Sequence, residues 1–80
     1  MPIDYKSYSI AALMRSIRKH EKRIAEHEGK IKNPGAYVTD WNEQNSQYKE
    51  GLIAYWGREV KNFHEQIRQA KEELARRETL

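Results

Sequence analysis

The chain has 80 residues, of which 34% are charged and 38% are hydrophobic, and its net charge at pH 7 is +3. A chain of this length forms one small domain with a modest core. It contains no cysteine, which excludes disulfides and thiolate metal sites. No apolar run approaches the roughly 20 residues of a membrane span, and the first residues lack the pattern of a signal peptide. We therefore expect one domain, residues 1–80, in the cytoplasm and without a membrane partner.

The first predicted helix spans about residues 8–32. A serine hydroxyl suits the N-cap position, and two serines stand there, Ser7 and Ser9. Four isoleucines recur every seven residues and share one heptad position: Ile10, Ile17, Ile24 and Ile31. Leu13 occupies the second apolar position of the heptad, but the later residues at that position are His20 and His27. The helix is therefore expected to be apolar at its start and half polar at its end.

A loop of residues 33–45 is predicted to follow. Pro34 disfavours helical geometry in the residue before it, and Gly35 permits the chain to turn. Asp40 and Glu43 have the spacing of a capping box, which predicts a short helical turn between them. Trp41 is expected to fold onto the closed end of the two helices and fix the loop there.

The second predicted helix spans about residues 46–77, with Asn45 and Ser46 at its entrance. Its apolar residues are spaced alternately three and four apart, which is an unbroken heptad stripe: Ile53, Trp56, Val60, Phe63, Ile67, Ala70 and Leu74. Favourable pairs four residues apart are expected to stabilise its last turns: Glu72 with Arg76, and Glu73 with Arg77.

Two helices joined by a short loop predict an all-α fold, an antiparallel two-helix hairpin of the coiled-coil type. Aligning the two stripes places Ile17 beside Ile67 and His20 beside Phe63. The same alignment places Ile10 near Leu74, Ile31 near Ile53, and His27 near Trp56.

A hairpin covers only one side of each stripe, and so small a core rarely supplies more than a few kcal/mol. Homodimerisation to a four-helix bundle, or docking on a larger protein, would cover the remaining apolar side chains. The predicted partner-contact residues are Met14, Leu52, Tyr55, Trp56 and Phe63.

The three histidines do not predict a metal site. His20 and His27 are seven residues apart, roughly 10 Å along a helix, whereas a helical zinc pair is spaced three or four residues apart. We expect both to be polar residues of the seam whose protonation weakens the hairpin or its dimer near pH 6. No glycine-rich phosphate loop and no serine with an evident base is present. The sequence thus predicts a protein that is not an enzyme, with no catalytic, cofactor-binding or metal-binding residue.

Nucleic-acid binding is the alternative function. Five basic residues cluster on the outer surface of the first helix: Arg15, Arg18, Lys19, Lys22 and Arg23. Phosphate contacts need such a stripe, although a solvated helix face has a similar composition.

The middle of the chain, about residues 17–74, also resembles a helical segment at the C-terminal ends of bacterial polymorphic toxins of the Rhs and contact-dependent-inhibition kind. The resemblance lies in Lys30 to Pro34, Tyr37-Val38, Asp40-Trp41, Gly51 to Trp56, Glu59-Val60 and Phe63 to Ile67. It implies an accessory or regulatory hairpin, without catalytic residues, that packs on a neighbouring domain or partner. The prediction is therefore a non-enzymatic protein–protein interaction module that binds itself or a larger, toxin-associated bacterial protein.

Overall fold

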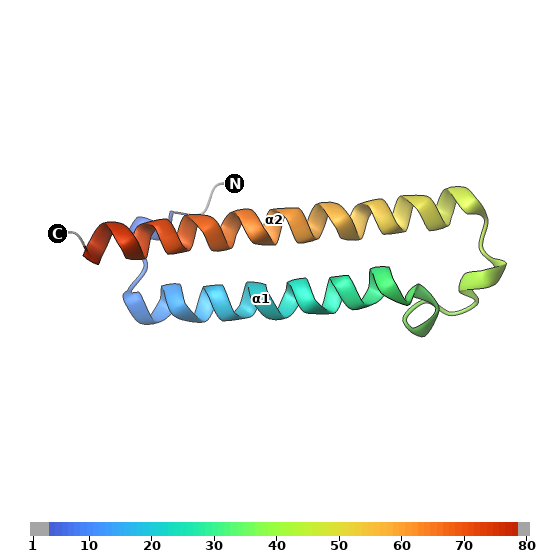
Figure 1. Ribbon diagram of the computed structural model, residues 1–80, viewed down its shortest axis with the longest axis horizontal. Coiled ribbons are helices and arrows are strands. Elements are labelled where there is room, and N and C mark those ends of the chain that lie inside the picture. The colour runs from blue at the N-terminus through green and yellow to red at the C-terminus, as the bar shows by residue number, and fades with distance from the viewer. Residues whose placement is uncertain (1–3, 79–80) are drawn as a thin grey trace.

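Two long helices lie side by side in the computed structural model, which describes residues 4–78 (Figure 1). Helix α1 spans Ile10–Lys32 and helix α2 spans Ser46–Glu78. Three short 3₁₀ turns complete the fold: η1 (Tyr5–Ser7) before α1, and η2 (Pro34–Ala36) and η3 (Trp41–Glu43) between the helices. The predicted all-α antiparallel hairpin is confirmed, and the observed helix bounds differ from the predicted ones by two residues at most. Within the described residues, neither helix is long and apolar enough to cross a membrane.

The helices begin at polar side chains that accept from their first free amides. The Ser9 hydroxyl accepts from the backbone N–H of Ala12 at 3.1 Å. At α2 the Asn45 carboxamide oxygen accepts from the backbone N–H of Tyr48 at 2.7 Å. Of the candidate caps, Ser9 and Asn45 therefore fill the role, because each satisfies a donor that the helix itself leaves free.

The loop contains the predicted short turn but not the predicted capping box. Asp40 precedes η3 with a φ of 57°, the left-handed region, and its side chain makes no capping hydrogen bond. An N-cap residue needs an extended backbone for its side chain to reach the following amides. Aspartate tolerates the left-handed region better than most residues, so Asp40 serves to turn the chain instead.

The core lies mainly in the half of the seam next to η1, and the buried Tyr5 belongs to it. The rest of it is formed by buried side chains of both helices: Leu13, Ile17 and Ile24 of α1 with Ile67 and Ala70 of α2. The ring centroids of His20 and Phe63 are 5.6 Å apart, which confirms the predicted alignment at that point. His27 also packs on Phe63, with ring centroids 5.4 Å apart, and Lys30 of α1 lies over the Trp56 ring.

The two helices differ in length, and the outermost isoleucines of the two stripes are exposed. Helix α2 has 33 residues and α1 has 23, so α2 extends beyond its partner by about 15 Å in total. Ile10 is 58% exposed and Ile53 is 37% exposed. Both ends of the seam are instead covered by segments outside the two helices.

At the loop end, a pair of tryptophans closes the hairpin. Trp41 stacks on the buried Trp56 with ring centroids 6.4 Å apart and an interplanar angle of 25°. The amine of Lys30 lies 6.0 Å from the Trp56 ring, and that of Lys49 lies 5.7 Å from the Trp41 ring. We call this group the tryptophan stack. It confirms the predicted position of Trp41 against the closed end.

At the opposite end, where both termini lie (Figure 1), residues 4–8 form a strap across the helices. The Tyr5 ring is buried and meets Tyr8 edge to face at 5.2 Å. The Arg77 guanidinium donates to the backbone carbonyls of Tyr5 at 3.3 Å, Lys6 at 3.2 Å and Tyr8 at 2.5 Å. This strap, held by Arg77, is called the N-terminal clasp below.

Candidate interaction surfaces

An exposed aromatic surface lies on α2 just after the loop end. Tyr55, a predicted contact residue, is 48% exposed, and Tyr48, one heptad earlier, is 45% exposed. Leu52, also predicted, is half-buried between them on the same side of the helix. Together with Gly51 these residues form what we call the tyrosine patch. Tyr48 was not among the predicted contact residues, although its seven-residue spacing from Tyr55, off the heptad stripe, was the available signal.

Two predicted contact residues belong to the interior of the hairpin. Trp56 is only 5% exposed, because Trp41 covers its ring. Phe63 is half-buried between the rings of His20 and His27. Trp56 is therefore a core residue and not an accessible contact residue, and Phe63 offers only part of its ring.

Met14 is exposed but lies far from the tyrosine patch. It is 46% exposed and stands one helical turn from the exposed Ile10. Because His20 lies beside Phe63 in the antiparallel pair, Met14 is level with about residue 69 of α2. That position is about 14 residues from Tyr55, or roughly 20 Å along the helix axis. The structure therefore does not bring Met14 together with Leu52 and Tyr55.

The predicted basic residues form a continuous exposed face on α1. All of them are exposed, and none takes part in an ion pair within residues 4–78: Arg15, Arg18, Lys19, Lys22 and Arg23. Helix α2 is organised differently, since Arg68 pairs with both Glu65 and Glu72. We call the five cations of α1 the basic face.

The histidine rings of the seam are held by carbonyl groups of their own helix. The Nδ1 atom of His20 lies 2.7 Å from the backbone oxygen of Ser16, and that of His27 lies 2.9 Å from that of Arg23. A carbonyl oxygen can only accept, so each Nδ1 is assigned the ring proton. Within the described residues, no group of three or more metal-ligating side chains comes together.

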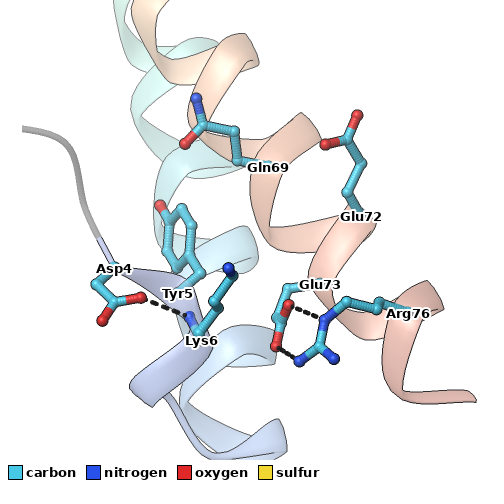
Figure 2. A pocket seen from close by; sticks show the side chains of 7 residues that line it. All are labelled: Asp4, Tyr5, Lys6, Gln69, Glu72, Glu73 and Arg76. Atoms are coloured by element: carbon cyan, nitrogen blue, oxygen red, sulfur yellow. Dashed lines mark hydrogen bonds and ion pairs between the residues drawn. The ribbon is translucent and has the colours of Figure 1, made fainter. Parts of the chain in front are cut away.

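A buried carboxylate with a shifted pKa, that of Glu73, lies at the open end beside the strap (Figure 2). Glu73 is 6% exposed and accepts from Arg76 at 2.8 and 2.5 Å and from Arg77 at 3.1 Å. The Arg76 hydrogen bonds, aided by those of Arg77, lower the pKa of Glu73 from 4.5 to about 2. A carboxylate this acidic has little tendency to take up a proton at neutral pH, so it suits ion pairing better than general-base chemistry.

The pocket beside Glu73 combines charges of both signs. It has a volume of about 290 Å³ and lies between the strap and α2, lined by Asp4, Tyr5, Lys6, Gln69, Glu72, Glu73 and Arg76 (Figure 2). Its arginine and Glu73 are committed to each other. The pocket is therefore a structural part of the N-terminal clasp.

Comparison with models of protein families, with curated proteins and with solved structures finds no match for this chain.

Proposed function

We propose that this chain is a non-enzymatic protein–protein interaction module that binds through the tyrosine patch, and that its partner there is a second copy of itself. The supporting observation is a pair of half-exposed tyrosines, Tyr48 and Tyr55, presented on one side of a long helix. Tyrosine offers a large apolar ring with a polar tip at a small cost in side-chain entropy, and it is enriched where binding energy is concentrated.

The tyrosine patch has the ridges and the low point that close helix packing requires. A Cβ atom added at Gly51 would meet nothing within 4 Å, so the surface is open there. Tyr48 and Tyr55 rise on either side of this low point, with Leu52 next to it. A second helix can approach closely at a glycine, and the two tyrosine rings would then flank it.

The patch is also complementary to itself. If a second α2 crosses antiparallel with its twofold axis between Gly51 and Leu52, Tyr48 of each copy meets Tyr55 of the other, and Gly51 meets Leu52. A twofold interface requires that one surface match its own rotated copy. This symmetric arrangement favours a second copy as the occupant.

A larger bacterial protein is the competing occupant, and the resemblance to toxin-associated hairpins supports it. Such a partner would cover the same tyrosines without the reciprocal pairing of Tyr48 with Tyr55. The experiment must therefore measure the association of the isolated chain with itself.

Sedimentation equilibrium over micromolar to millimolar concentrations tests the proposal. We expect the wild-type chain to form a dimer and the variant Tyr48→Ser/Tyr55→Ser to remain monomeric. Tyr37→Ser is the matched control, because Tyr37 is 57% exposed but lies outside the patch. A wild-type chain that is monomeric throughout would overturn the assignment of a second copy, as would a dimer that survives the double substitution.

The two glycines of α2 provide a finer test. Gly51 and Gly57 both have open space where a Cβ would stand, but Gly57 lies on the face of α2 opposite Tyr48. Either change to alanine should stabilise the helix by up to about 1 kcal/mol. Gly51→Ala should also weaken dimerisation, and Gly57→Ala should not. Equal dimerisation of the two variants would exclude close helix approach at Gly51.

A further inference from the structure

We propose that the basic face of α1 is a binding site for the phosphate backbone of nucleic acid, separate from the tyrosine patch. The first observation is the arrangement of its charges. Like charges recur four residues apart in three pairs: Arg15 with Lys19, Lys19 with Arg23, and Arg18 with Lys22. Each such pair destabilises an isolated helix by a few tenths of a kcal/mol. Glu21 and Glu26 offset part of this repulsion, because each lies three or four residues from at least one of these cations. The remaining excess of positive charge on one face is what a surface that binds an anion would show.

The second observation is a groove along this face. It has a volume of about 520 Å³ and is lined by Tyr8, Ala12, Arg15, Ser16, Lys19 and His20. Two of these side chains are cationic, three others can donate hydrogen bonds, and none is a carboxylate. The pocket between the strap and α2 differs from it, since three carboxylates, those of Asp4, Glu72 and Glu73, line that pocket beside Lys6 and Arg76. An anion is therefore favoured in the groove of α1 and disfavoured in the pocket of α2.

A third observation concerns the hydroxyl group in the groove. The Nδ1 atom of His20, to which the ring proton is assigned, lies 2.7 Å from the backbone oxygen of Ser16 and 3.3 Å from the Ser16 hydroxyl oxygen. Because the ring nitrogen is the donor in both contacts, the hydroxyl accepts from it and keeps its own proton. Ser16 can then donate to a phosphate oxygen beside Arg15 and Lys19.

The length of the face favours a polyanion over a single phosphate group. From Arg15 to Arg23 the cations extend about 12 Å along the helix axis. One phosphate ion would engage only the side chains around the groove, whereas a nucleic-acid backbone presents charges repeatedly along its length. A membrane surface would require a bulky apolar face beside the cations. Of the large apolar residues of α1, Leu13, Ile17 and Ile24 are buried in the seam, and the exposed Ile10 and Met14 at its start do not extend along the cations.

The test is fluorescence anisotropy of a labelled 20-base-pair DNA duplex titrated with the full chain at several salt concentrations. Five phosphate contacts predict a slope of log affinity against log salt of at most about −4.5, or a loss of up to about 500-fold between 50 and 200 mM. The variant Arg15→Ala/Lys19→Ala/Arg23→Ala should bind with a slope shallower by about 2.7.

The matched control is Arg58→Ala/Lys61→Ala/Lys71→Ala, which removes the same charge from exposed residues of α2. We expect it to retain the wild-type slope. The triple variant of α1 should melt at the wild-type temperature or above, since it removes repulsive pairs, and this separates lost binding from unfolding.

Absence of binding at 25 mM salt would overturn the proposal. An equal loss of DNA affinity in the two triple variants would also overturn it, because DNA would then be attracted by the net charge of the chain alone. Tighter binding to phosphatidylserine vesicles than to the duplex would assign the face to a membrane instead, and binding of inorganic phosphate with equal affinity would reduce it to a single-anion site.

Discussion

The two ends of the hairpin are closed by different physical means. At the loop end the chain is continuous, and the tryptophan stack needs only ring contacts to fix the loop against Trp56. At the open end the strap must be held by directional bonds, which Arg77 supplies to three backbone carbonyls. Burial of aromatic surface is insensitive to pH, whereas an arginine clasp anchored by a carboxylate is not. We therefore expect that each end of the hairpin can be opened without opening the other.

The largest effect is expected at the loop end, from Trp56→Ala. Removing a tryptophan that is 5% exposed deletes its burial and leaves a cavity, at a cost of about 3–5 kcal/mol. Urea unfolding followed by circular dichroism measures the change. A loss below about 1 kcal/mol would show that the ring is not part of the core.

At the clasp, Arg77→Ala should destabilise the protein less, by about 1–3 kcal/mol, because partly buried carbonyls lose their donor. The loss should be local, so amide hydrogen exchange should accelerate in residues 4–8 and remain slow around Trp56. Uniform acceleration along the chain would contradict the independence of the two ends.

Trp41→Ala should lower the melting temperature by several degrees, since Trp41 is only half-buried over Trp56. The effect should be smaller than that of Trp56→Ala and should not depend on pH. An unchanged melting temperature would indicate that Trp41 serves a partner surface.

Acid should open the clasp before the tryptophan stack. The pKa of Glu73 is lowered to about 2 by its hydrogen bonds to Arg76 and Arg77. A lowered pKa contributes stability that is complete above the ordinary value of 4.5 and is lost as the pH falls through about 2. Near pH 3 we expect the protection factors of the strap amides, which correct for the slower intrinsic exchange in acid, to fall. Tryptophan fluorescence, which reports only the loop end, should stay native.

Glu73→Gln should remove this local acid response. Glu65→Gln is the control: the pKa of Glu65 is also lowered to about 2, by Arg68, but the pair is exposed and lies away from the strap. A strap that responds to acid equally in both variants would contradict the role of Glu73.

The smallest effect is expected from Tyr5→Phe. The Tyr5 hydroxyl is buried and finds no hydrogen-bond partner among residues 4–78. Removing it should leave stability unchanged or raise it by about 1 kcal/mol, because an unsatisfied polar group is costly to bury. A clear loss of stability would show that the hydroxyl is hydrogen-bonded in solution.

The sequence predicted the helices and their alignment well because heptad spacing determines which faces meet. The contact of His20 with Phe63 and the position of Trp41 follow from this pattern. Exposure at the ends of the seam was predicted less well, since it depends on which segments outside the two helices cover each end. Trp56 was therefore taken for a contact residue when it is buried.

The clasp could not be predicted from spacing. Its bonds join Arg77 to backbone carbonyls of residues 5–8, about 70 positions away in the chain, and a backbone carbonyl has no sequence signature. The predicted pair of Glu73 with Arg77 is present at 3.1 Å, but it positions a donor for the strap as well as closing the helix. The partner surfaces remain proposals, because a sequence of this composition predicts exposed faces without identifying what binds them.

The first and last residues that the structure describes belong to the strap and to the end of α2, which meet at the clasp, and this has a mechanical consequence. Tension between them would act across the hairpin at one end, so the helices would peel apart row by row from the clasp toward the loop. Pulling on one terminus and the loop would instead load the whole seam in shear. Single-molecule force measurements should therefore record a lower rupture force in the first geometry than in the second.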